Sequence, residues 1–167
     1  MFELKIKQDL KAIERLSKKY PEVSKTVRIS RLTEATLLLE RTVRQKTPEG
    51  AGPIHLRDTV FQRVISYGAS SGGTVRGTVG TPAVYGEPVE YGTKPHWPPP
   101  GPIEYWAVHK LGVSADEAKA VAFLIARKIA AKGTKGAHMF EKGFAEAEPA
   151  VRNILEQIPA EIERMLQ

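Results

Sequence analysis

Histidines and carboxylates are the side chains here whose chemistry could support metal-dependent or acid–base catalysis. The chain has four histidines, His55, His96, His109 and His138. No two of them have the H-x-x-x-H spacing that places two imidazoles on one helix face. Glu87 and Glu90 lie in a stretch predicted to be a strand, where residues three apart point to opposite faces. These patterns do not favour a metal site or a carboxylate pair, and a zinc site assembled from distant positions is left open.

Nucleophilic catalysis and phosphate binding find equally little support. Cysteine is absent, and there is no G-x-S-x-G elbow and no Ser/His/Asp set at the spacing of a known catalytic triad. Residues 133–136 (GTKG) resemble part of a phosphate-binding loop but lack the rest of the motif and a preceding strand. We therefore expect a protein that is not an enzyme and that uses no cofactor. A hydrolase or nuclease with a dispersed His/Glu site is the least favoured alternative.

The most unusual stretch is residues 85–106, which hold six of the 12 prolines and both tryptophans. Such a density of proline excludes a continuous helix and suits an edge strand better than a central one. We expect an edge strand over residues 84–91, a projecting loop from Gly92 onward and a short amphipathic helix over residues 103–109. The aromatic side chains of the stretch are too many for a solvated linker and predict a contact surface. In the alternative interpretation, Trp97 and Trp106 cap the core.

The positive charge is concentrated at the N-terminal end. Up to Lys46 there are 12 Lys/Arg and six Asp/Glu, and from Thr47 onward there are 13 of each, so the whole net charge of +6 belongs to the first segment. A basic helical face could meet phosphate or an acidic protein. The candidate nucleic-acid-facing residues are Arg28, Arg31, Arg41 and Arg44. The alternative is an ordinary solvated helix face with interspersed carboxylates.

The helices and strands that position these residues follow from periodicity. Residues 2–7 alternate apolar and polar side chains and predict a strand, and helices are predicted from Asp9 and over residues 21–46. Residues 59–67 and 74–80 predict two more strands. Ser114 and Glu117 form a capping box for a well-buried helix that stops at Gly133, with Phe123 and Leu124 widening its apolar stripe. A last helical stretch follows, and Pro149 and Pro159 should kink or restart it.

We therefore expect an α+β fold in which a small antiparallel sheet of about four strands packs on N-terminal and C-terminal helices. Residues 1–167 would form a single domain, with basic helices in 1–46, the sheet and loop in 47–101 and helices in 102–167. No stretch of about 18 apolar residues predicts a membrane span, and no signal peptide is visible. The absence of cysteine fits an intracellular life.

The order of features resembles the tail-completion (neck, or minor tail) proteins of long-tailed bacteriophages. In that family a short strand and two helices are followed by Thr-Pro, a glycine-containing turn and a leucine, as in Thr47, Pro48 and Leu56 here. Next comes a V-E-x-G-T signature, matched by residues 89–93 and followed here by a Pro-His pair. A small-residue and aromatic turn before the last helix is matched by residues 136–140. The helices carrying Trp106 and Ser114 look like an insertion.

The resemblance implies a structural role as part of a ring at the head–tail junction or in tail completion. The partners would be other copies of the chain, the phage connector and tail proteins, with genomic DNA passing through the channel as a further contact and no membrane. The protein would reside in the virion, and in the host cytoplasm during assembly. The interface hypothesis covers Glu90, Tyr91, Gly92, Thr93, Lys94, Pro95, His96, Trp97 and Pro98.

Overall fold

The computed structural model describes residues 10–50, 55–68 and 73–167. Its contacts divide the chain into two units: unit 1 is Met1–Gln45, Val60–Gly80 and Phe140–Gln167, and unit 2 is Lys46–Thr59 and Thr81–Met139. Both helices and antiparallel strands are present, which confirms the α+β class. The strand expected at residues 2–7 lies outside the described residues, and the single domain stays a prediction.

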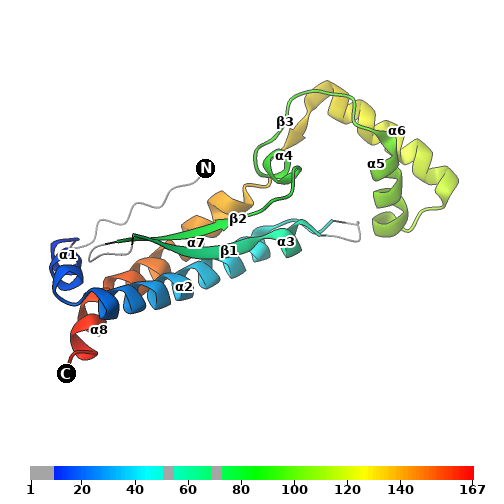
Figure 1. The fold of residues 1–167 in the computed structure, drawn as a ribbon. Coiled ribbons are helices and arrows are strands. Elements are labelled where there is room, and N and C mark those ends of the chain that lie inside the picture. The colour runs from blue at the N-terminus through cyan, green and yellow to red at the C-terminus, as the bar shows by residue number, and fades with distance from the viewer. Residues whose placement is uncertain (1–9, 51–54, 69–72) are drawn as a thin grey trace. The chain divides into compact units, whose positions relative to one another are not determined.

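Four helices belong to unit 1: α1 (Leu10–Lys19), α2 (Pro21–Lys46), α7 (Met139–Glu156) and α8 (Ile158–Arg164) (Figure 1). The predicted bounds of α2 are confirmed. The helix begins at Pro21 because proline suits a first helical turn and Glu22 lies near the positive end of the helix. At the bend between α1 and α2, the buried hydroxyls of Ser17 and Ser24 are 2.7 Å apart. Pro149 lies inside α7, whereas Pro159 lies in the first turn of α8 and so restarts the helix, as expected.

The strands of unit 1 form a two-stranded antiparallel ribbon, β1 (Phe61–Tyr67) and β2 (Thr74–Gly80). Both strands were predicted from their β-branched and aromatic residues. Gly77 on β2 lies so close to α2 that a Cβ there would be 2.6 Å from a methyl group of Thr36. The Thr36 hydroxyl is also 3.1 Å from the side-chain oxygen of Gln62 on β1. One face of the ribbon therefore packs on α2.

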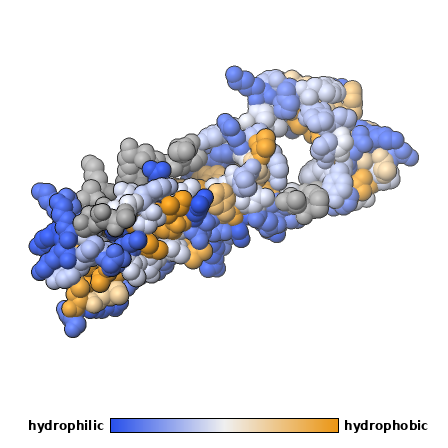
Figure 2. All heavy atoms as spheres, in the orientation of Figure 1, coloured by the Kyte–Doolittle hydropathy of each residue, from blue (hydrophilic) through white to orange (hydrophobic). Residues whose placement is uncertain are grey.

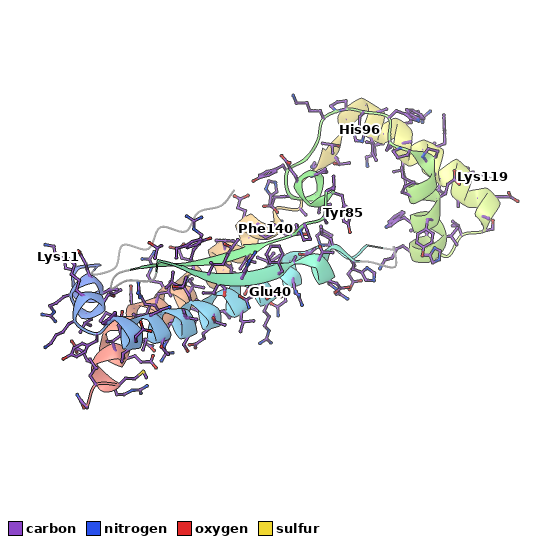
Figure 3. All side chains as sticks on the ribbon, in the orientation of Figure 1. Lys11, Glu40, Tyr85, His96, Lys119 and Phe140 are labelled. Atoms are coloured by element: carbon purple, nitrogen blue, oxygen red, sulfur yellow. The ribbon has the colours of Figure 1, made fainter. Side chains whose placement is uncertain are left out.

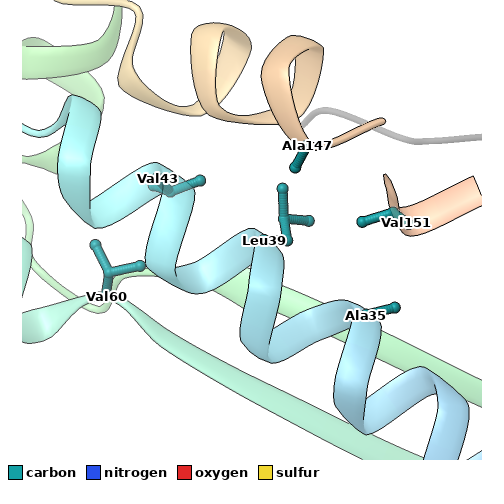
Figure 4. Packing of buried hydrophobic residues seen from close by; sticks show 6 residues of the cluster. All are labelled: Ala35, Leu39, Val43, Val60, Ala147 and Val151. Carbon is teal, nitrogen blue, oxygen red and sulfur yellow. The ribbon is translucent and has the colours of Figure 1, made fainter. Parts of the chain in front are cut away.

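The core of unit 1 lies between α2, α7 and the start of β1. Its buried members are Ala35, Leu39, Val43, Val60, Ala147 and Val151 (Figure 4). At Gly143 of α7 the two helices meet closely, since a Cβ there would be 2.9 Å from the Cα of Val43. A second cluster joins Leu16 and Val27 to Ile158 and Ile162, which fastens α8 to the first two helices.

Unit 2 consists of short elements followed by a helical hairpin: α3 (Leu56–Thr59), α4 (Gly86–Tyr91), β3 (Gly92–Thr93), α5 (Pro100–Trp106), the π-helical turn η1 (Ala107–Leu111), α6 (Ala115–Lys132) and β4 (Thr134–Lys135). α5 and α6 lie side by side (Figure 1). β3 pairs antiparallel with β4, with Thr93 opposite Thr134. The segment 94–133 therefore begins and ends at one short β-ladder.

The prediction of about four strands in one sheet is wrong for the described residues, which form two separate two-stranded sheets. Residues 84–91 are also not an edge strand, because residues 86–91 are the helix α4. Pro88 lies near the start of this helix, where a missing amide hydrogen costs nothing. Gly86 is buried, and a Cβ there would be 2.7 Å from a methyl group of Thr81, so packing rather than periodicity fixes this turn.

The expected capping box of α6 is confirmed. The Ser114 hydroxyl accepts from the Glu117 amide, and the Glu117 carboxylate accepts from the Ser114 amide at 2.9 Å. Gly133 ends the helix with φ at +68°, as expected. Of the helices in the described residues, none has the length and hydropathy needed to cross a bilayer.

Candidate functional site

The V-E-Y-G-T segment, residues 89–93, is fastened by its backbone to residues 133–138. The carbonyl of Val89 accepts from the Ala137 amide at 2.7 Å, and that of Glu90 accepts from the His138 amide at 3.1 Å. The Thr93 hydroxyl lies 3.0 Å from the Thr134 hydroxyl and accepts from the Thr134 amide at 3.2 Å. The backbone of the V-E-Y-G-T segment is thus paired within the chain.

Glycine is required at three points of this fastening. Gly92 has φ at +80°, and a Cβ there would overlap the carbonyl oxygen of Thr134. A Cβ at Gly133 would overlap the carbonyl oxygen of Thr93, and one at Gly136 that of Glu90. Only glycine lets the two backbones approach this closely. The GTKG sequence, which resembled part of a phosphate loop, is therefore the partner strand and turn of the V-E-Y-G-T segment.

The residues of the interface hypothesis divide into a buried and an exposed set. Glu90 and Pro98 are buried, and Gly92 and Thr93 are half-buried. The exposed members are Tyr91, Lys94, Pro95, His96 and Trp97. The His96 ring nitrogen Nδ1 lies 2.9 Å from the Lys94 carbonyl oxygen, which holds this loop in a tight turn (Figure 3). Only the exposed set is available to a partner.

Trp97 is 56% exposed and does not cap the core. Its ring and that of Phe123 on α6 pack in a T-shaped arrangement, with ring centroids 5.9 Å apart and an interplanar angle of 61°. Trp106 on α5 is 37% exposed, and Tyr105 stacks on His109 with centroids 3.8 Å apart. The core-capping alternative is therefore wrong for Trp97, and the aromatic stretch presents rings at the surface.

The sequence prediction missed the outward face of α6. Its buried row is made of Ala118, Ala122 and Ala126, whereas Phe123 and Leu124 are each 55% exposed. The expectation of a well-buried helix is wrong, because the close approach of α5 accepts only the alanine row. We define the α6 face as Phe123, Leu124, Arg127 and Lys128 together with Trp97. The signal that could have located it is the alanine spacing of four residues, which is typical of a closely packed helix pair.

Three of the four candidate nucleic-acid-facing arginines are engaged within unit 1. Arg28 donates to the Gly73 carbonyl at 2.6 Å, and partial burial lowers the pKa of its guanidinium. Arg44 donates to the Val60 carbonyl at 2.7 Å and pairs with Glu40 at 2.7 Å.

Arg31 of α2 pairs with Glu161 of α8 and with Glu34, and the hydrogen bond that Arg31 donates to Glu161 is the main reason that the pKa of Arg31 is raised. Among the described residues Arg41 alone of the four has no such contact, and it is exposed. The set therefore does not form a free basic face.

A small ionic cluster lies beside α3. Glu49 pairs with Lys110 at 3.4 Å and with Arg57 at 3.3 Å, and the hydrogen bond and charge of Lys110, with the charge of Arg57, lower the pKa of Glu49. His55 is close to this cluster, and its Nδ1 atom is buried without a hydrogen bond in the described part of the chain. Over those same residues, no three His, Asp or Glu side chains are grouped so that they could hold a metal ion.

Comparison with known proteins adds no relative. No protein family, curated protein or solved structure matches the chain.

Proposed function

We propose that this chain is a structural assembly protein of a bacteriophage virion, a ring component at the head–tail junction or in tail completion. The observation that carries the proposal is the exposed aromatic loop after the V-E-Y-G-T segment. Tyr91 and Trp97 are each more than half exposed, and they flank a loop whose base is fixed by the β3–β4 ladder. Large exposed aromatic side chains on a fixed base are typical of protein-binding anchors.

The fixed base supports binding for an energetic reason. A partner that docks on Trp97 does not have to order a free loop first, so less conformational entropy is lost on association. The side-chain contacts, rather than an added strand, would carry the affinity, since the backbone of residues 89–93 is already paired. The proposal assigns no catalytic role and no cofactor to the chain.

The first test is deletion of the gene from the phage or prophage that carries it, followed by electron microscopy of the particles. Filled heads beside free tails would support a role at the junction, and absent or abnormally long tails would support a role in tail assembly. Normal infectious particles would contradict the proposal.

A complementation test addresses the loop itself. Replacing His96 and Trp97 together with alanine should abolish assembly, because the exposed rings are lost, while the melting temperature changes little. Leu37→Ala is the matched control, since Leu37 is a large apolar residue that is 50% exposed on α2 of unit 1. A large fall in melting temperature of the His96/Trp97 variant, or full complementation by it, would contradict the role of the loop.

A second candidate function is contact with DNA, which the outer face of the ribbon favours. Arg63 and Arg76 are exposed there, Arg76 lies 5.8 Å from the Tyr67 ring centroid, and neither strand contains an acidic residue. A two-stranded ribbon has the width to enter a major groove. Binding to duplex DNA that falls steeply with salt, and less steeply for Arg63→Gln/Arg76→Gln, would support it. Salt-independent binding or none would contradict it.

A further inference from the structure

The α6 face is an apolar patch with a basic side. Phe123 and Leu124 point outward from α6, and Trp97 extends the patch by resting against Phe123. Arg127 and Lys128 lie one helical turn further along the same face and are exposed. Neither of them has an ion-pair partner among the described residues. Figure 2 shows hydrophobic and hydrophilic side chains intermixed over the surface of α5 and α6.

Three large, half-exposed apolar side chains beside unpaired cations are the arrangement of an interface centre and its rim. Such a patch calls for a partner that offers apolar surface and negative charge together. Leu124 would gain nothing from stacked bases, so a nucleic acid suits the patch poorly. The complement is a protein surface with small apolar side chains and carboxylates.

The outward stripe of α7 has this composition. Its exposed small residues are Ala145, Pro149 and Ala150, and the carboxylate of Glu156 is exposed as well. Over the whole helix there are four glutamates and two basic residues, a net charge of 2 − 4 = −2. Between Lys119 and Phe140 the chain has no acidic residue at all. The α6 face is bulky and basic, whereas the α7 stripe is small and acidic. The two surfaces are therefore complementary in shape and charge.

Pro149 adds a polar feature to the α7 stripe. Proline has no amide hydrogen, so the carbonyl oxygen of Ala145 does not receive the usual helical hydrogen bond from residue 149. An indole N–H or a guanidinium, both present on the α6 face, is a donor that this carbonyl can accept from.

We infer that the α6 face binds the α7 stripe of a second copy of this chain. The contact joins two different surfaces, so it is heterologous: repeated, it closes into a ring or grows into an open filament. The inference deepens the proposed function and rests on it for its place in the virion, because it names the surfaces through which ring subunits would meet.

Cysteine crosslinking tests the contact directly, because the natural chain has no cysteine. Phe123→Cys and Ala150→Cys are introduced in separate copies, which are then mixed and oxidised, both as pure protein at high concentration and in virions that carry both. A disulfide between the two variants is the expected product. Ala160→Cys, an exposed alanine on α8, replaces Ala150→Cys as the matched control and should not be linked.

The other products overturn the inference. Disulfides only between two Phe123→Cys copies would mean a symmetric contact, and equal linking of Ala160→Cys would mean random collision. No disulfide in either sample would mean that the two surfaces do not meet.

A charge-reversal series provides the second measurement. Arg127→Glu/Lys128→Glu should lower the yield of complete particles about tenfold or more, because like charges would face each other across the contact. Adding Glu156→Lys in the same chain should restore part of the yield, and a failure of this rescue in variants with unchanged melting temperature would overturn the inference. If gene deletion blocks assembly while the cysteines stay unlinked, the proposed function stands and this inference fails. If deletion leaves particles normal, the crosslinking of pure protein still decides whether the contact exists.

Discussion

Replacing Gly143 with alanine would place a methyl group against the backbone of α2. The added Cβ would lie 2.7 Å from Cγ2, 2.9 Å from Cα and 3.1 Å from the amide nitrogen of Val43. The Val43 side chain can turn away by changing rotamer, but its Cα and amide nitrogen cannot move without shifting the helix. Val43 is also fully buried in the core of unit 1, so α2 and α7 would have to separate (Figure 4).

Two opposing terms set the magnitude. Overpacking a core costs about 1–3 kcal/mol, and backbone contacts put this site at the upper end. Alanine is better than glycine in a helix interior by about 1 kcal/mol, which offsets part of the cost. The net loss in free energy of unfolding is therefore about 2 kcal/mol. For a chain of this size it corresponds to a fall in melting temperature of roughly 4–8 °C.

Chemical denaturation and thermal melts followed by circular dichroism measure both quantities. Gly101→Ala is the matched control, because a Cβ at Gly101 of α5 meets nothing within 4 Å. That variant should be unchanged or slightly more stable. If Gly143→Ala is as stable as Gly101→Ala, the close crossing of α2 and α7 is refuted, and with it the argument that glycine is needed there.

Three further predictions concern single contacts. Ser24→Ala should cost about 1–3 kcal/mol, because the buried Ser17 hydroxyl loses its partner, while Ser17→Ala/Ser24→Ala should cost less; equal losses in urea denaturation would contradict this. Gly92→Ala should lower the melting temperature strongly and release the β3–β4 ladder, seen as faster amide exchange at Thr134; wild-type exchange would refute the required glycine. Hydrogen bonds from the Ser114 hydroxyl and amide lower the pKa of Glu117. The cap therefore stabilises α6 fully above about pH 4.3, the ordinary pKa of glutamate in an unfolded chain. This contribution is lost as the pH falls through the lowered pKa of Glu117 in the folded protein. Ser114→Ala should therefore be less stable than wild type at neutral pH, with the difference shrinking in acid; a gap that widens in acid would contradict the sign.

The long helices and the ribbon could be predicted from the sequence because local signals and packing agree there. Pro21 and Glu22 mark the start of α2, and Ser114 with Glu117 marks the start of α6. The β-branched runs of β1 and β2 likewise match the strands that form. At these places the local preference and the tertiary packing favour the same structure.

The helix α4 could not be predicted in the same way. Val84 and Val89 favour a strand locally, and Pro88 is compatible with either an edge strand or a first helical turn. What decides is the burial of Gly86 against Thr81 and the hydrogen bonds from Ala137 and His138, which come from far along the chain. As a result Glu87 and Glu90 lie on a helix rather than a strand, and Glu90 is buried.

The outward position of Phe123 and Leu124 was hidden for a related reason. α6 has apolar residues on both of its faces, so hydropathy predicts burial for the alanine row and for the Phe/Leu pair equally. Only the partner helix determines which row is buried. α5 has no fully buried residue of its own and lies close against α6, so the small side chains face it.

The pairing of Thr93 with Thr134 has a consequence for which changes of chain length the fold can accept. Because the two threonines face each other across an antiparallel ladder, a tight two-residue turn is enough to connect them directly. The 40 intervening residues, 94–133, can thus be gained, lost or exchanged in one genetic event without redirecting the chain on either side. The aromatic loop, the helical hairpin and the α6 face all lie within this segment, so removing or grafting it moves all three together.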